Sequence, residues 1–313
     1  MLRYTLKRLL ATIPVMAIVA LFVFSLLYLS PGDPAAVIAG DIATEADIAK
    51  IRAQLGLDQP YLVRFGSWLG DLARGDLGTS IFTQLPVSKL IGQRIEPTLA
   101  LTLCTLIVAV GLAVPLGVLA AARAGGWVDR IVMAISVLGF SVPVFVIAYG
   151  LIFTFSVWLE WLPVQGYRSL SEGFVPFIRH MILPSLALGL VYMALIARIT
   201  RATMLDVLSQ DYVRTATAKG LAPGTVLVRH ALKNAAVPIV TIIGIGVALL
   251  IGGVVVTETV FAIPGLGRLT VDAILRRDYP IIQGVTLLFS AVYVLVNLLV
   301  DLSYSLFDPR IRY

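Results

Sequence analysis

Long uncharged runs of apolar residues, separated by short charged segments, set the pattern of this chain. An α-helix rises about 1.5 Å per residue, so about 17–25 apolar residues cross the hydrocarbon core of a bilayer. Six runs have a suitable length: 9–32, 97–122, 131–159, 181–197, 234–257 and 279–300. The pattern predicts an all-α membrane protein with six transmembrane helices.

Composition agrees with this prediction. The 313 residues are 59% hydrophobic and only 13% charged, whereas soluble domains carry about 25% charged residues. The net charge of +6 lies mostly in short segments beside the apolar runs, which is typical of membrane topology and not of nucleic-acid binding. Cys104 is the only cysteine and lies within an apolar run, so an intramolecular disulfide is excluded.

The first run follows three basic residues, Arg3, Lys7 and Arg8. It is longer than the apolar region of a signal peptide, which spans about 7–15 residues. We therefore expect a retained transmembrane helix that ends within residues 30–34. A signal peptide cleaved near Ala39 is the alternative.

Residues 33–96 form the most polar long stretch. Thr44 and Asp47 have the spacing of a capping box, and Gly56 follows at the expected end of that helix. A second helix is predicted from Pro60, with an inward face that has helical spacing: Leu62, Phe65, Leu69 and Leu72. These apolar stripes favour a small helical extracytoplasmic insertion over the alternative of a disordered loop.

Proline and glycine mark two of the later spans. Pro143 lies inside the third run and predicts a kink there. The fifth run is rich in glycines, whose small size allows membrane helices to approach closely: Gly244, Gly246, Gly252 and Gly253.

The distribution of charge predicts the orientation. Residues 198–234 carry six basic and two acidic residues, whereas residues 33–96 carry six basic and eight acidic ones. Arg310 and Arg312 add positive charge at the C-terminus. The positive-inside rule therefore places both termini, the turn at 123–130 and the 198–234 loop in the cytoplasm.

No catalytic, metal-binding or nucleotide-binding motif occurs. The chain has no Walker A sequence, H-E-x-x-H, G-x-S-x-G or paired metal-ligand spacing, so no catalytic residue, metal or cofactor is predicted. The spans carry no charged residue except Asp301, which argues against proton or ion coupling. Neutral polar residues are candidates for a substrate pathway, with ordinary interhelical hydrogen bonds as the alternative role: Ser136, Ser141, Thr154, Ser290, Tyr293 and Asn297.

Residues 211–241 are too charged to cross a bilayer, and they have the pattern of two short helices around a glycine turn. Tyr212, Val213 and Ala216 share one helical face. Gly220 occupies the position after a helix end where a left-handed residue is favoured, and Pro223 suits a first helical residue. On the second helix one face is predicted to hold Leu227, His230, Ala231 and Asn234.

Residues 214–236 resemble the cytoplasmic EAA loop of ABC-importer permeases, in the form R-T-A-x-x-x-G followed by H-A-L-x-N-A that is typical of the di- and oligopeptide branch. Arg214 and Thr215 replace the first two residues of the general Glu-Ala-Ala pattern, so a docking glutamate is not expected. Two further segments resemble the same family: GDLGTSI at 75–81, and E-T-V-F-x-x-P-G-x-G-R-L at 258–269 with R-D-Y-P at 277–280.

The resemblance implies the B-type permease subunit of an ATP-driven, binding-protein-dependent importer of di- or oligopeptides, with the type I ABC-importer fold. Such a subunit is not an enzyme, and it forms half of a translocation pathway in a bacterial inner membrane. Its implied partners are a second homologous permease in a heterodimer, two ATPase subunits that bind ATP and Mg, an extracytoplasmic binding protein and membrane lipid, but no nucleic acid. Coupling to the ATPase would involve Tyr212, Val213, Arg214, Thr215, Ala216, Gly220 and His230.

The expected organisation is a first segment and span at 1–32, the extracytoplasmic insertion at 33–96, and a core permease domain at 97–313 with the coupling loop at 198–234. Relatives in this branch carry dipeptides, longer peptides, glutathione, nickel chelates or opines, so the exact substrate stays open. The alternative function is a polytopic membrane enzyme whose extracytoplasmic site holds the clustered carboxylates Glu258, Asp272 and Asp278.

Overall fold

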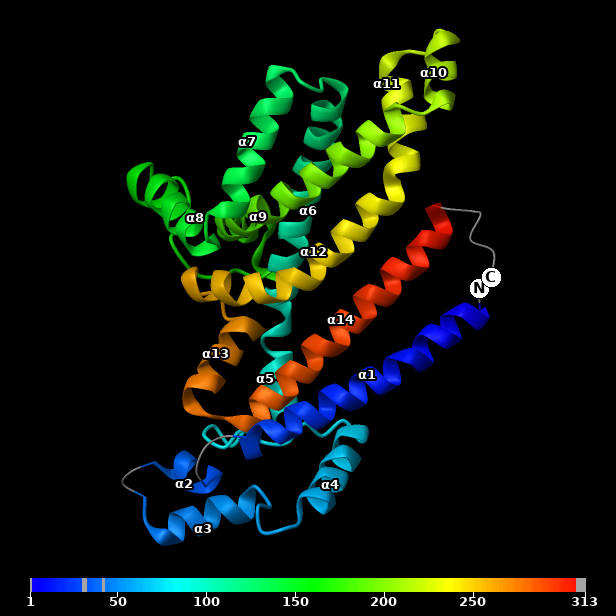
Figure 1. Cartoon of the computed structure of the whole chain (residues 1–313). Helices are drawn as coiled ribbons and strands as arrows, with labels where there is room; N and C mark the ends of the chain where they lie inside the picture. The colour runs from blue at the N-terminus through cyan, green and yellow to red at the C-terminus, as the bar shows by residue number, and fades with distance from the viewer. Residues whose placement is uncertain (1, 30–32, 41–42, 308–313) are drawn as a thin grey trace. The chain divides into compact units, whose positions relative to one another are not determined.

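The computed structural model describes residues 2–29, 33–40 and 43–307 (Figure 1). Within these ranges every regular element is a helix, and one isolated bridge joins Thr79 and Pro86. The chain forms two compact units: Glu96–Gly267 with the chain from Leu295, and Leu2–Ile95 with Arg268–Val294. The predicted all-α class is confirmed.

Helices of the first unit share one apolar core. Its central member is α9, which packs against α7, α8 and α12. Leu101, Met181, Leu188 and Leu250 are almost fully buried in this core. The principal helices are α6 (Ile95–Ala122), α7 (Trp127–Ser141), α8 (Val144–Leu151), α9 (Phe174–Leu208) and α12 (Lys233–Val260).

Small residues allow the close approach that was expected of the glycine-rich span. A Cβ on Gly253 would lie 2.6 Å from Leu188 Cδ1, and one on Gly244 would lie 2.2 Å from Val300 Cγ2. Gly252 faces open space instead, because no atom lies within 4 Å of its Cβ position. The interhelical contacts therefore require some of these glycines and not others.

Five stretches are long and apolar enough to cross a membrane: Leu10–Leu29, Val87–Ala122, Phe174–Leu208, Pro223–Leu250 and Tyr279–Ser303. The pair Trp127–Ser141 and Val144–Trp158 makes a sixth if it forms one span, although the two helices meet at 106°. Figure 1 shows α8 turning away from α7 at this break.

The kink predicted at Pro143 is a complete break. Val142 adopts an extended conformation with ψ 127°, and Pro143 becomes the cap that precedes α8. The residue before a proline is driven out of the helical region by the proline ring, which explains why the bend is so large. Beyond α8 the chain continues as a π-helical segment, η1 (Ile152–Trp158).

The second unit begins with α1 (Leu2–Leu29), α2 (Pro34–Ala39) and α3 (Glu45–Gln54). The Thr44 and Asp47 capping box is present, with both reciprocal hydrogen bonds. Gly56 has φ +62° and lies just beyond the end of α3, as predicted. The predicted end of the first span lies partly outside the described residues, as do Arg310 and Arg312.

The predicted inward face of α4 (Tyr61–Ala73) is wrong in part. Leu62 is 77% exposed and Leu69 is 43% exposed. The face that packs on α1 is aromatic instead, because Phe65 and Trp68 lie with ring centroids 5.2 and 5.3 Å from Phe24. Large aromatic rings bury more apolar area than leucines, so they decide which of two overlapping stripes turns inward.

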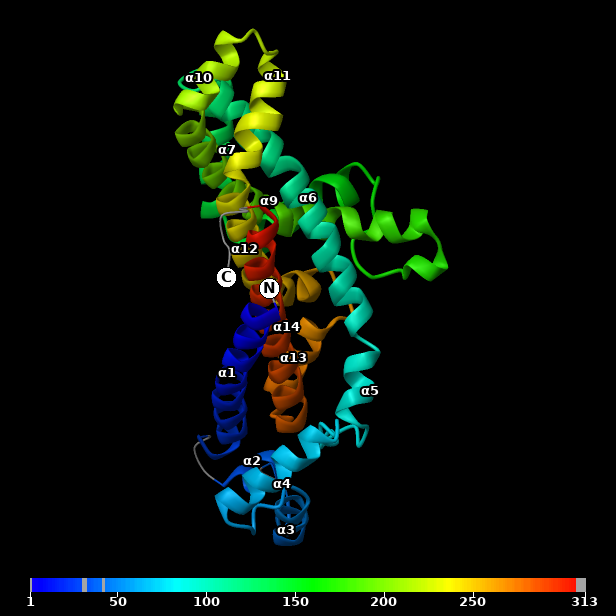
Figure 2. The same cartoon turned by 90° about the vertical axis from the view of Figure 1, so that its right-hand side faces the viewer.

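The remaining helices of the second unit are α5 (Val87–Gly92) and parts of α13 (Leu266–Arg276) and α14 (Tyr279–Phe307). Leu287 of α14 packs with Ala20 and Val23 of α1, and Figures 1 and 2 show these two helices side by side. Asp278 is buried before α14, where it accepts hydrogen bonds from the Ser80 hydroxyl at 2.5 Å and the Ile81 N–H at 3.3 Å.

Candidate functional site

The loop singled out by sequence forms a helical hairpin between α9 and α12. It comprises α10 (Asp211–Ala218), α11 (Pro223–Thr225) and the π-helical segment η3 (Val226–Leu232). Both views show α10 and α11 beside each other at one end of α9 and α12 (Figures 1 and 2). We call residues 211–232 the coupling hairpin.

Gly220 makes the turn of this hairpin. Its φ is +77°, and its N–H donates to the Thr217 carbonyl at 2.9 Å, while the Leu221 N–H reaches the Ala216 carbonyl at 3.4 Å. This pair of bonds is a Schellman motif, which closes a helix end and requires a left-handed residue. The predicted conformation of Gly220 is confirmed, and Pro223 is the first residue of α11 as predicted.

Val213 and Ala216 do not form an exposed docking face. Both are buried within the first unit, where they pack with Val226 and with the end of α9. Tyr212, by contrast, is 42% exposed. The sequence pattern correctly grouped apolar residues on one face, but that face holds the hairpin together, and Tyr212 is its exposed neighbour.

The second arm of the hairpin is continuous with α12, so the helix that contains the predicted fifth span begins earlier than Asn234. Its buried positions are Val226, Ala231 and Ala235, which are five and then four residues apart. A π-helical turn contains one residue more than an α-helical turn, so it shifts the buried stripe by one position. For this reason the predicted face is wrong in part: Leu227 and Ala231 pack in one apolar cluster, whereas Asn234 is exposed.

The polar residues of the hairpin remain accessible. Arg214 has a side chain 74% exposed, and its guanidinium lies 3.4 Å from Asp211, which is too exposed for a strong ion pair. The Thr215 hydroxyl donates to the Asp211 carbonyl at 2.9 Å. His230 is half-buried, and its carbonyl accepts a hydrogen bond from the Asn234 side chain at 2.7 Å.

An ion pair that the sequence pattern did not reveal joins α7 to the end of α9 that leads to the hairpin. The Arg201 guanidinium donates two hydrogen bonds to the Asp129 carboxylate, and the second measures 2.7 Å. Asp129 is 4% exposed and also accepts from the Gly125 N–H at 2.9 Å. Bidentate bonds of this kind hold both side chains in one orientation. Seventy-two positions separate the partners, so no local pattern pairs them.

The candidate pathway residues fall into separate groups. Ser136 and Ser141 come together, because both line one groove between α7 and α9. The hydroxyls of Ser136, Ser141, Thr154 and Ser290 each donate to the carbonyl four residues earlier. Thr154 lies on η1, whereas Ser290, Tyr293 and Asn297 lie along α14.

A buried carboxylate fixes the turn that follows α12. Glu258 is fully buried and accepts from the Thr98 hydroxyl at 2.5 Å, and the Thr98 oxygen accepts from the Leu266 N–H at 2.8 Å. A Cβ on Gly265 would lie 2.0 Å from Glu258 Oε1, so only glycine fits beside this carboxylate. The P-G-x-G segment at 264–267 therefore packs directly on the Glu258 side chain.

The carboxylates of the alternative enzyme site have different surroundings. Glu258 and Asp278 are both buried and bonded to hydroxyls, whereas Asp272 is exposed. Among the described residues, no group of three or more His, Cys, Asp or Glu side chains has the arrangement of a metal site. These two carboxylates stabilise turns of the backbone.

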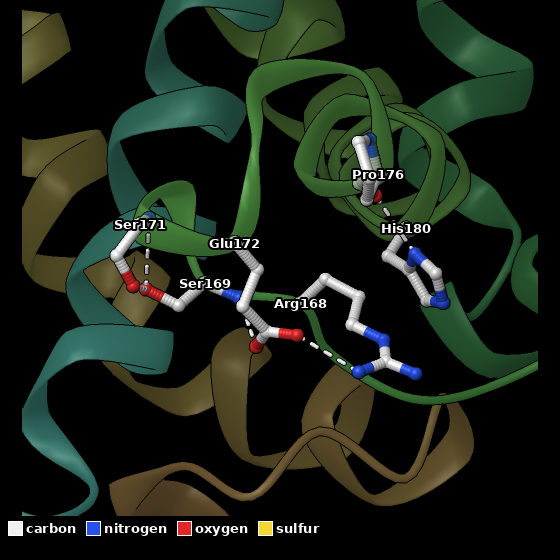
Figure 3. A network of polar contacts seen from close by, with 6 residues as sticks. All are labelled: Arg168, Ser169, Ser171, Glu172, Pro176 and His180. Carbon is white, nitrogen blue, oxygen red and sulfur yellow. Dashed lines mark hydrogen bonds and ion pairs between the residues drawn. The ribbon is translucent and has the colours of Figure 1, made fainter.

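The loop before α9 carries a second polar network (Figure 3). Arg168 donates to the Glu172 carboxylate at 2.8 Å, and the other Glu172 oxygen accepts from the Ser169 N–H at 3.2 Å. These bonds hold the pKa of Glu172 below its ordinary value, with the Arg168 hydrogen bond as the largest cause. The His180 ring lies on α9 and bonds the Pro176 carbonyl at 2.8 Å.

Comparison with known proteins identifies the family. The model of the binding-protein-dependent transport system inner membrane component matches residues 113–313, and the model of the N-terminal part of such components matches residues 1–102. A methionine ABC transporter, MetNI, in inward-facing conformations shares the fold, with a TM-score of 0.59 and 18% identity over 71% of this chain and 97% of the other.

Relatives match from end to end. A probable peptide ABC transporter permease protein from Sinorhizobium fredii is 58% identical over 99% of both chains. The glutathione transport system permease protein GsiC from Salmonella choleraesuis is 46% identical over the whole length of both. A putative peptide transport system permease protein from Brucella abortus is 45% identical over 98% of both. The chain therefore belongs to the inner membrane components of binding-protein-dependent transport systems, as a multi-pass permease subunit of the ABC-importer type.

Proposed function

We propose that this permease subunit imports di- or oligopeptides and forms half of their translocation pathway. The observation that carries the proposal is the end-to-end identity with permeases named for peptides and glutathione. Glutathione is itself a tripeptide, so the two names share one substrate chemistry. Uptake is driven by ATP, which the partner ATPases bind with Mg.

The assembly that we propose has a second, homologous permease, two ATPase subunits and an extracytoplasmic binding protein. Both termini and the coupling hairpin would face the cytoplasm, and residues 33–96 would form the extracytoplasmic insertion ahead of the core domain at 97–313. The excess of basic residues in 198–234 supports this orientation.

Coupling would pass through the hairpin as one body. Buried Val213 and Ala216 fasten α10 to the end of α9, so a push on the hairpin moves α9. Asp129 and Arg201 fasten α9 to α7, and α7 would therefore follow. Tyr212 is the exposed aromatic anchor for a groove on the ATPase, because aromatic side chains supply much of the binding energy at interfaces.

Reconstitution of the four kinds of subunit in vesicles tests the substrate proposal. We expect ATP-dependent uptake of a labelled dipeptide or of glutathione that requires the binding protein. Uptake of neither, by an assembly whose ATP hydrolysis responds to its binding protein, would refute the peptide assignment and leave the family membership intact.

Tyr212→Ala tests the docking role. We expect this variant to lose most of the ATPase that co-purifies with the membrane subunits. Tyr149→Ala is the matched control, because Tyr149 is a comparably exposed tyrosine on α8, remote in sequence from the hairpin. Equal recovery of ATPase with both variants would remove Tyr212 from the proposed interface.

A further inference from the structure

A groove of about 100 Å³ lies between α7 and α9 in the first unit. Apolar side chains from both helices line most of it, and the polar contributors are Ser136, Ser141 and Arg198. The two serines were predicted from sequence as pathway residues, but Arg198 was not. The groove therefore places one full positive charge beside two neutral hydroxyls in a largely apolar setting.

Arg198 has no acidic partner in the part of the chain that the structure describes. Its guanidinium lies over the Phe140 ring, 6.0 Å from the centroid, and its side chain is exposed. Arg201, one turn further along α9, behaves differently because Asp129 neutralises it. Because no carboxylate of the described residues meets it, the exposed Arg198 guanidinium keeps its parallel N–H donors available for an anionic ligand.

The serine hydroxyls supply acceptors beside this charge. Ser136 Oγ donates to the Val132 carbonyl and Ser141 Oγ to the Val137 carbonyl, each at 2.8 Å. A hydroxyl that donates in this way keeps lone pairs that accept a further hydrogen bond. The groove thus offers a cation and neutral acceptors, which suits a ligand with a carboxylate and a nearby N–H group.

We propose that this groove binds the C-terminal residue of a peptide during its passage. The carboxylate pairs with the Arg198 guanidinium, which presents parallel N–H donors, and the amide N–H of the same residue donates to a serine oxygen. The groove volume corresponds to roughly three water molecules, so it holds the end of a peptide and not the whole molecule. This inference rests on the proposed peptide substrate, and it names Arg198 as a specificity-determining residue.

The test measures protection of a thiol in the groove. Ser141→Cys is introduced on a Cys104→Ala background, and the whole assembly is treated with a maleimide in the presence of alanyl-alanine or its C-terminal amide. We expect the free acid to slow labelling by about tenfold, because its charge-assisted hydrogen bond to Arg198 tightens binding by about that factor. The amide should slow it less than about twofold, because it lacks the negative charge.

Two further variants assign the effect to Arg198. Arg198→Gln should abolish protection by the free acid. Arg130→Gln is the matched control, because Arg130 also lies over an aromatic ring on α7, 5.6 Å from the Trp127 centroid, but it does not line the groove. Protection should survive in this control.

Three outcomes would overturn the inference: equal protection by acid and amide, protection that persists in Arg198→Gln, or labelling that responds to added phospholipid and not to alanyl-alanine. The last outcome would show that Arg198 binds a lipid phosphate and not a peptide carboxylate. An assembly that takes up no peptide but still shows acid-specific protection would refute the proposed substrate alone, so the two failures are distinguishable.

Discussion

At the scale of single residues, Gly220 is the position where the backbone conformation most clearly requires glycine. Its φ of +77° is left-handed, yet no atom lies within 4 Å of the position that a Cβ would take. A side chain there is strained by the backbone alone and not by crowding. A residue other than glycine costs about 1–2 kcal/mol in this conformation, which is small for a membrane domain of this size and large for a short docking element.

We therefore expect Gly220→Val to express and assemble but to lose ATP hydrolysis stimulated by the binding protein, together with uptake. Gly224→Val is the matched control, because Gly224 lies in the same hairpin, has open space around its Cβ position and lacks a positive φ. Both activities are measured in reconstituted vesicles. Wild-type transport by Gly220→Val would contradict the coupling role of the hairpin.

The lowered pKa of Glu172 predicts that the stability of the 168–173 loop depends on pH. Because Arg168 and the Ser169 N–H favour the charged carboxylate, its pKa in the folded protein lies below the ordinary 4.5. The stabilisation is complete above pH 4.5 and is lost as the pH falls through the lower, folded value. The 168–173 loop should then open more often in acid.

Hydrogen exchange of the loop amides, corrected for the intrinsic effect of pH, measures this opening between neutral pH and pH 3. Arg168→Gln should flatten the dependence. The exposed pair of Asp71 and Arg74, with a longer separation of 3.4 Å, is a reference that should show little change. An acid response in Arg168→Gln equal to that of the wild type would rule out the ion pair as its cause.

At the scale of helices, the sequence predicted where turns and helix ends lie more reliably than which neighbour each helical face packs against. The Gly220 turn and the Thr44 capping box follow from local chemistry, so they could be predicted. Helical spacing showed that Val213 and Ala216 share a face, but spacing does not say whether that face meets the same chain or a partner. The π-helical turn in η3 and the break before Pro143 also shift faces in ways that a regular period does not describe.

The Asp129 and Arg201 pair shows what local pattern cannot reach, since only tertiary packing brings the two together. Breaking a buried pair costs about 3–5 kcal/mol. Asp129 has a side chain 6% exposed but Arg201 is 26% exposed, so we expect a loss of roughly 2–3 kcal/mol for either alanine variant. The double variant should cost less than the sum, with a coupling of about 1–3 kcal/mol.

Unfolding of the three variants in detergent measures this cycle. Arg168→Ala is a control, because its partner Glu172 is half-exposed and solvent screens the attraction in such a pair. If the two single losses add without interaction, the pair does not hold α7 to α9, and the proposed relay from the hairpin to α7 loses its support.

At the scale of the whole molecule, orientation follows from charge and not from the fold, because the same helices can be inserted in either direction. The 198–234 loop carries a net charge of +4, from six basic and two acidic residues, and residues 33–96 carry −2. Short basic loops are retained in the cytoplasm, whereas long segments cross largely regardless of charge. The hairpin is therefore the stronger determinant, and it places residues 33–96 on the opposite side if an odd number of spans separates them.

Thiol labelling decides this orientation, because Cys104 is the only native cysteine and Cys104→Ala removes the background. Lys219→Cys reports the tip of the hairpin and Asp58→Cys reports the segment between α3 and α4; both positions are exposed. In intact cells we expect a membrane-impermeant maleimide that has access to the periplasm to label Asp58→Cys only. In inverted membrane vesicles it should label Lys219→Cys only. Labelling of residue 58 alone from the cytoplasmic side would reverse the proposed orientation and place the hairpin where no ATPase can reach it. Labelling of both positions from one side would require an even number of spans between them. That result would show that the bent pair α7 and α8 does not cross the membrane as one span.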